Sequence, residues 1–166
     1  MNDQEAQIIG SRLAMKSVLF GAIVAYLVMT FMTWSWDNII EALTWIKHIG
    51  YVKNLLVGLL GLLVFGYIFG KKAGHEIIIQ KKDHTWVGFK YGFLTLWAGT
   101  FVGCLVGFFE EGLDNIGTGD NPFEDYFFKP FFWITIFGLV PVVLVGFWFG
   151  SQIKKKGRRE SSANHA

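Results

Sequence analysis

The chain has 166 residues, of which 52% are hydrophobic and only 17% are charged, and its formal net charge is +2. Soluble domains carry about 25% charged residues, and a soluble domain of this length could not bury so much apolar surface in one core. The single cysteine, Cys104, excludes an internal disulfide framework and a cysteine-based metal site.

The first apolar run follows Lys16 and predicts a membrane-spanning helix over about 17–36. A helix needs about 20 apolar residues to cross the hydrocarbon core of a bilayer. This run is longer than the core of a cleavable signal peptide, and it ends in Thr-Trp-Ser-Trp rather than in small residues. We therefore expect it to be retained, with residues 1–16 forming a cytoplasmic N-terminal tail.

The loop over 37–53 carries apolar residues at helical spacing, namely Ile39, Ile40, Leu43 and Ile46. This pattern predicts a short amphipathic helix lying on the outer membrane surface, with a helical extension of the first span as the alternative. A second span is predicted over about 54–70. After it, 76–80 has the composition of a strand, but an isolated strand is marginal, so a helix continuing from the second span is the other interpretation.

The third span is predicted over about 88–109 and the fourth over about 130–153, followed by a basic cytoplasmic tail over 154–166. These runs are continuously apolar, whereas the strands of a membrane β-barrel alternate apolar and polar residues. The sequence thus predicts an all-α, four-helix transmembrane domain over 17–153. Pro141 lies in the middle of the fourth span, removes one backbone donor and predicts a kink.

Basic residues predict the orientation of the spans, because short cytoplasmic loops are rich in Lys and Arg. The two termini and the middle loop, which would share one side, hold 12 of the 15 basic residues, and the other side holds Lys47, Lys53 and Lys129. We therefore expect both termini to lie in the cytoplasm of a cell with an inner (plasma) membrane.

Glycines spaced four or seven residues apart are the clearest local signal. Such small residues let helix backbones approach closely in a membrane. The candidate helix-packing residues are Gly66, Gly70, Gly92, Gly99, Gly103, Gly107, Gly146 and Gly150. These stripes predict seams inside one four-helix bundle or an interface with a second subunit. The first interpretation is favoured, since every small bundle needs seams, and both hold if different stripes serve each purpose.

A two-helix repeat is a further possibility. The second and fourth spans end in similar segments, 65–70 and 145–150, and each precedes basic residues. Two such repeats would be parallel, related by an axis along the membrane normal. Similar composition of two Gly- and Phe-rich segments is the alternative.

Residue patterns that carry chemistry are missing from the apolar runs. The uncharged cores of the four spans hold no ionisable residue, and Lys90 at the start of the third span is expected to extend towards the cytoplasmic surface. His75, Asp83 and His84 do not have a familiar metal-ligand spacing, and no catalytic or phosphate-binding motif is present. We therefore expect no cofactor, no metal and no enzymatic activity.

Two other features bear on partners. The basic tail is predicted to contact anionic lipid head groups rather than nucleic acid, through Lys154, Lys155, Lys156, Arg158 and Arg159. Most tryptophans lie near span ends, where amphipathic rings favour the head-group level, but Trp97 lies deeper and the sequence offers no partner for it.

The sequence therefore predicts a non-enzymatic membrane protein that acts through helix–helix contacts, as a subunit, an anchor or a protective partner. Its expected partners are the lipid bilayer and either a second copy or another membrane protein. A small oligomeric channel or transport unit is the alternative, indicated by the glycine-rich third span and Pro141 in the fourth. The layout is similar to that of small four-helix bacterial inner-membrane proteins and of immunity proteins against pore-forming toxins, although no motif extends that likeness.

Overall fold

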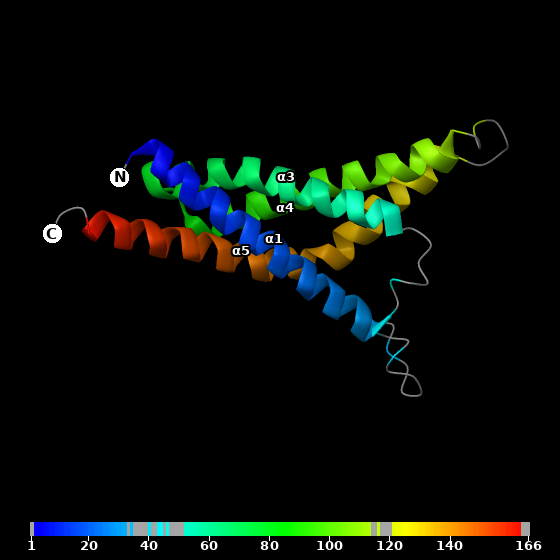
Figure 1. The fold of residues 1–166 in the computed structure, drawn as a ribbon, viewed down its shortest axis with the longest axis horizontal. Coiled ribbons are helices and arrows are strands. Elements are labelled where there is room, and N and C mark those ends of the chain that lie inside the picture. The colour runs from blue at the N-terminus through cyan, green and yellow to red at the C-terminus, as the bar shows by residue number, and fades with distance from the viewer. Residues whose placement is uncertain are drawn as a thin grey trace.

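A computed structural model describes residues 2–32, 34, 40, 43, 44, 46, 52–113, 116 and 121–163. Four long helices form the fold: α1 (Asp3–Met32), α3 (Val52–Gly74), α4 (His84–Gly107) and α5 (Lys129–Ala163). Three π-helical turns extend them (Figure 1). The turn η2 (His75–Ile79) continues α3, η3 (Phe108–Gly112) continues α4, and η4 (Glu124–Phe128) leads into α5.

All four helical segments are long and apolar enough to cross a membrane. The prediction of an all-helical chain with four such segments is confirmed. The strand interpretation of 76–80 is wrong, because η2 continues the helix through Ile79. Most of the surface helix predicted over 37–53 lies outside the described residues.

The helices form a four-membered ring. α1 packs against α3 and α5, and α4 packs against the same two helices from the other side. The N-terminus, the C-terminus and the connection between η2 and α4 lie at one end of the bundle (Figure 1). We call this the terminal end, and the opposite end, where α1 and η3 end and α3 and η4 begin, the loop end.

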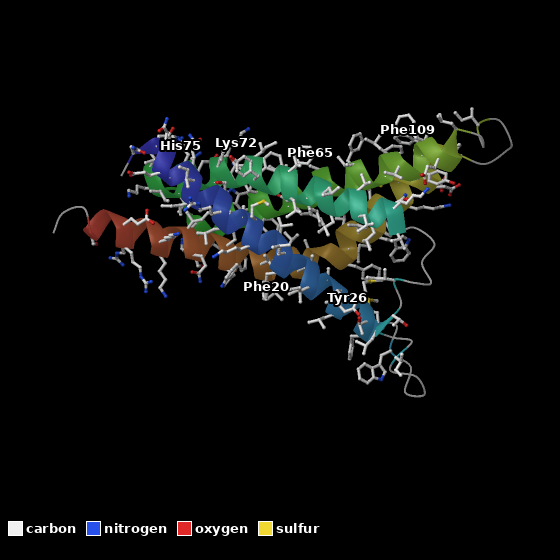
Figure 2. All side chains as sticks on the ribbon, viewed as in Figure 1. Phe20, Tyr26, Phe65, Lys72, His75 and Phe109 are labelled. Atoms are coloured by element: carbon white, nitrogen blue, oxygen red, sulfur yellow. The ribbon has the colours of Figure 1, made fainter. Side chains whose placement is uncertain are left out.

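The best-buried core lies at the terminal end rather than in the middle of the apolar runs. Its fully buried members include Ala6 on α1, Ala73 on α3, Val87 on α4 and Ile153 on α5. The reason is that α1 and α5 continue helical well beyond their apolar runs, so side chains of four helices meet there. Figure 2 shows polar side chains gathered towards the ends of the bundle, with His75 and Lys72 at the terminal end.

The second half of α1 diverges from α3 and α4 but keeps a contact with α5, where the Phe20 and Trp148 rings lie 5.6 Å apart. No residue between Val18 and Met29 is buried, and Figure 1 shows this part of α1 diverging from α3 and α4 towards the loop end. Large apolar side chains are consequently exposed along it, and Phe31 is 77% exposed. Lipid is a suitable solvent for such a surface.

The connection between η2 and α4 is tight. Lys81 adopts a left-handed conformation with φ of 57°, and the next N–H, of Lys82, donates to the Glu76 carbonyl oxygen over 3.0 Å. Asp83 then caps α4, because its carboxylate accepts a 2.8 Å hydrogen bond from the Trp86 backbone N–H. A left-handed residue followed by a cap turns the chain back within four residues.

Candidate functional site: the glycine crossings and the central cavity

Two helix crossings at the terminal end bring backbones into direct contact. In the first, a β-carbon added to Gly10 of α1 would collide with the carbonyl oxygen of Gly70, and one added to Gly74 would collide with that of Ala6. In the second, a β-carbon on Gly88 of α4 would collide with the carbonyl oxygen of Gly146. Glycine is required at these positions because no side chain fits between the two backbones.

The second crossing continues the same way, since a β-carbon on Gly150 would collide with the carbonyl oxygen of His84. Gly88 in the α4–α5 crossing is therefore equivalent in position to Gly10 in the α1–α3 crossing. Gly146 and Gly150, the partners of Gly88, correspond to Gly70 and Gly74. The similarity of 65–70 to 145–150 in the sequence had instead paired them with Gly66 and Gly70. The correspondence is shifted by one helical turn, because the glycine pair that meets the crossing lies at the very end of α3.

A third seam joins α3 to α4 towards the loop end. A β-carbon on Gly99 would lie 2.5 Å from the Leu62 side chain, and one on Gly103 would lie 3.0 Å from the carbonyl oxygen of Asn54. Gly107 lies against the Asn54 side chain, with 2.7 Å between its added β-carbon and Nδ2. Gly99, Gly103 and Gly107 of α4 are thus turned towards α3 of the same chain, whereas Gly92 is turned towards Val142 of α5.

All eight glycines selected from the sequence lie against a neighbouring helix of the same chain, within 3.6 Å of its atoms when a β-carbon is added. Gly10, Gly74 and Gly88 were missed because they lie at or beyond the edges of the apolar runs. A signal existed for all three, since each lies four residues from another small residue: Gly10 from Ala6 and Ala14, Gly74 from Gly70, and Gly88 from Gly92.

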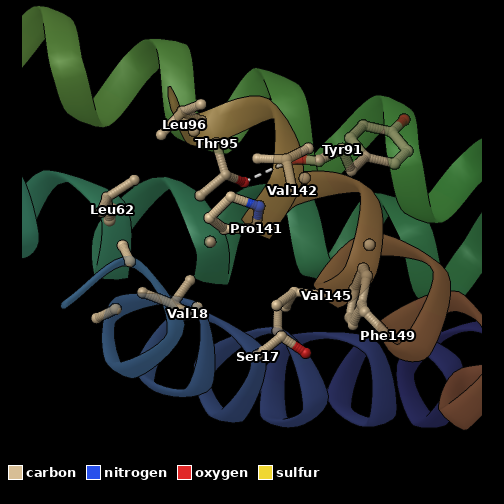
Figure 3. Close-up of a pocket in the computed structure, with 18 of the residues that line it drawn as sticks. Ser17, Val18, Leu62, Tyr91, Thr95, Leu96, Pro141, Val142, Val145 and Phe149 are labelled. Atoms are coloured by element: carbon tan, nitrogen blue, oxygen red, sulfur yellow. Dashed lines mark hydrogen bonds between the residues drawn. The ribbon is translucent and has the colours of Figure 1, made fainter. Parts of the chain in front are cut away.

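A cavity of about 140 Å³ lies at the centre of the ring and is lined by residues of all four helices. Figure 3 shows Val18 from α1, Leu62 from α3, Leu96 from α4 and Val142 from α5 around it. Pro141 is buried and belongs to this wall. α5 stays helical through Pro141, although the missing N–H leaves the Phe137 carbonyl without its usual helical partner.

The cavity wall offers no unsatisfied polar side chain. The Ser17 hydroxyl donates to the Leu13 carbonyl oxygen over 2.8 Å, and the Thr95 hydroxyl donates to the Tyr91 carbonyl oxygen over 2.7 Å, as the dashed line in Figure 3 shows. Both hydroxyls are therefore satisfied by their own helix. The Tyr91 hydroxyl points away from the cavity, to Glu76.

Glu76 is the centre of a polar cluster at the terminal end, with a side chain only 14% exposed. Its carboxylate accepts from the Tyr91 hydroxyl over 2.7 Å and from Lys90 Nζ over 3.2 Å, and Lys82 Nζ lies 3.4 Å away. Lys90 also lies over the Tyr91 ring, 4.4 Å from its centroid. The Lys90 side chain, which we expected to extend towards the surface, thus forms an ion pair with the Glu76 carboxylate of η2.

The two histidines of this end lie apart. The His75 ring pairs with Asp3 of α1 and with the Gln80 side chain, whereas His84 Nδ1 lies 3.5 Å from Asp83. Within the described ranges, no three His, Cys, Asp or Glu residues are grouped closely enough to hold a metal ion.

The basic residues near the C-terminus lie on the exposed side of α5, and Lys154, Lys155, Lys156, Arg158 and Arg159 are all exposed. Between them, Gly157 is buried against Ile78 of η2. The end of α5 is therefore anchored by its apolar face while its cations remain accessible.

Trp97 finds a partner in the next helix. Its Nε1 donates to the Thr135 hydroxyl of α5 over 3.1 Å, and its ring lies beside those of Phe93 and Phe131. The hydrogen bond explains how an indole N–H is accommodated far from the span ends.

The chain matches no protein-family model, no curated protein and no solved structure. Its class is defined by its own fold: four apolar helices of membrane-spanning length, packed as a ring, indicate a multi-pass membrane protein.

Proposed function

We propose that the chain is a non-enzymatic protein of the inner (plasma) membrane that acts through helix–helix contacts, with both termini in the cytoplasm. A second copy of the chain is the partner we favour, and another membrane protein is the alternative. The observation that supports this proposal is an exposed apolar face on the second half of α1, the part of this helix that diverges from α3 and α4.

The surface has a defined shape. Leu19, Ile23, Leu27 and Phe31 are four residues apart on α1 and are each more than half exposed, so they form one ridge along the helix. Ridges of this kind pack into grooves of another helix. The eight glycines selected from the sequence, by contrast, already lie against helices of the same chain, so the ridge is the better candidate for contact with a partner.

The orientation is supported by the position of the cations. The basic C-terminal residues, Lys71, Lys72 and Lys82 all belong to the terminal end, where the two termini meet (Figure 1). Anionic lipids of the cytoplasmic leaflet attract such a cluster, by about 1 kcal/mol per cation near the surface. We therefore assign the terminal end to the cytoplasm.

We also propose that the α1–α3 and α4–α5 hairpins descend from a duplication, because Gly10 and Gly88 occupy matching places in the two crossings. Aligning homologous chains on these two glycines should raise the similarity between the halves. No rise above that of unrelated apolar helices would contradict the duplication.

Disulfide crosslinking tests the helix-contact proposal. In a Cys104→Ser background, Leu27→Cys should give, on mild oxidation of native membranes, a covalent dimer of twice 18.8 kDa. Val140→Cys on α5 is the matched control, since Leu27 and Val140 are both 56% exposed. A product of other mass at Leu27 alone would favour a different membrane partner. Equal crosslinking at both positions, or none at either, would contradict contact through the ridge.

A transport unit is the second candidate function, and the cavity lined by all four helices is the observation that favours it. Its apolar wall suits an apolar solute rather than an ion, which would lose its hydration without replacement. Reconstituted vesicles that show no flux of either kind would argue against this candidate.

A further inference from the structure

We infer that the central cavity is a binding site for a segment of one acyl chain of a membrane lipid. The inference concerns the interior of the bundle, and it does not depend on the proposed partner contacts of α1.

The first support is the chemistry of the wall. The hydroxyls of Ser17 and Thr95 are bonded to their own helices and that of Tyr91 to Glu76. A buried water needs two to four polar partners, and an apolar cavity of about 150 Å³ stays dry and takes up apolar molecules. The cavity of this chain, about 140 Å³, is of that size and character.

The second support is that two glycines keep the cavity open although a side chain would fit. A β-carbon on Gly21 would lie 3.9 Å from Val145, and one on Gly92 would lie 3.6 Å from Val142. These are ordinary contacts, unlike the collisions at Gly10 or Gly88. Close approach of two backbones therefore does not require glycine at Gly21 or Gly92. Glycine inside a helix costs about 0.5–1 kcal/mol relative to alanine, and at these two positions that cost leaves the cavity open.

The third support is the direction of access. Tyr91 lines both the apolar cavity and the polar cleft of the terminal end, with its hydroxyl held by Glu76 and its ring beside that of Phe69. It therefore separates the cavity from the charged residues. On the other side, α1 diverges from α3 (Figure 1), and the wall there consists of small α1 residues such as Ala22 and Ala25. The cavity thus faces the hydrocarbon, where acyl chains are the abundant ligand.

Photolabelling in vesicles tests the site. The full chain is reconstituted in phosphatidylcholine containing a small fraction of phosphatidylcholine with a diazirine on one acyl chain, irradiated, and mapped by mass spectrometry. We expect labelling of Val142, which is only 9% exposed and lines the cavity. Val140, two residues away and 56% exposed, reports labelling by bulk lipid.

Filling the cavity should then remove the label. Gly92→Val and Gly21→Val, on two different helices, are each expected to reduce labelling of Val142 several-fold while Val140 is unchanged. Gly58→Ala is the control, since its β-carbon would lie 3.6 Å from Gly103 and Gly58 is not among the residues that line the cavity.

In the wild type, the Val142 label should saturate as the labelled fraction of lipid rises, whereas the Val140 label should increase in proportion. Absence of label at Val142, a strictly proportional increase there, or full labelling of Val142 in a folded filled variant would overturn the inference. The wild-type titration decides the matter even where a valine variant fails to fold.

Discussion

The Tyr91 hydroxyl donates a 2.7 Å hydrogen bond to Oε1 of Glu76 and so joins the wall of the cavity to the polar cluster at the terminal end. Because Glu76 belongs to η2 and Tyr91 to α4, this bond also holds η2, at the end of α3, against α4.

Removing the Tyr91 hydroxyl should destabilise the fold. A hydrogen bond to a charged group contributes about 1.5–3 kcal/mol. We expect Tyr91→Phe to lower the free energy of unfolding by an amount near the lower end of this range, because Lys90 still pairs with Glu76. Thermal unfolding in detergent micelles measures this. Tyr67→Phe is the control, because the Tyr67 ring keeps its contact with Lys71. Equal effects of the two substitutions would contradict the assignment.

Alanine substitution of two glycines one turn apart on α4 should change the free energy of unfolding in opposite directions. Gly88→Ala forces a methyl group into the Gly146 backbone and should cost about 1–3 kcal/mol or more, as overpacking does. Gly92→Ala meets only an ordinary contact with Val142 and should stabilise by about 0.5–1 kcal/mol. Unfolding curves of the two variants in the same detergent give the comparison, and the same sign for both would refute it.

The Trp97–Thr135 pair should show energetic coupling across α4 and α5. Interhelical hydrogen bonds in membrane proteins average about 0.6 kcal/mol in double-mutant cycles. We expect Trp97→Phe, Thr135→Val and the double variant to yield a coupling energy of that order. Strict additivity of the two single changes would mean that the 3.1 Å contact contributes nothing.

Relieving the left-handed backbone at Lys81 should stabilise the connection between η2 and α4. A left-handed residue with a β-carbon costs about 1–2 kcal/mol, so Lys81→Gly is expected to raise the free energy of unfolding by up to about 1 kcal/mol. Lys82→Gly should do the reverse, because it removes a cation 3.4 Å from Glu76. A loss of stability in Lys81→Gly would show that φ of 57° imposes no strain.

The Asp83 cap of α4 should make the free energy of unfolding depend on pH in the acid range. The Trp86 backbone N–H, donating to the carboxylate, lowers the pKa of Asp83 in the folded chain. The ionised cap therefore contributes fully above the ordinary aspartate pKa of about 3.9, and its contribution is lost as the pH falls towards the lower folded pKa. Asp83→Asn keeps an oxygen acceptor without a charge.

The stability difference between the wild type and Asp83→Asn, measured by thermal unfolding between pH 6 and pH 2, should accordingly shrink or change sign on the acid side. A difference that stays constant over this range would contradict the role of the carboxylate.

The four membrane-length helices could be predicted from composition alone, because an uncharged run of about 20 residues has few other stable environments. Glycine spacing likewise identified residues of the seams, since a four-residue step places small residues on one helix face. Both are local properties of the chain.

The position of the crossings was decided by the tertiary structure. Gly10, Gly74 and Gly88 lie near the ends of the apolar runs, and only the meeting of α1 with α3, and of α4 with α5, makes them indispensable. The partners of Lys90 and Trp97 are equally non-local, lying 14 and 38 residues away. Hydrophobicity determines that a segment is a helix in lipid, but the closest approach of two backbones fixes which faces meet, and that depends on segments distant in the sequence.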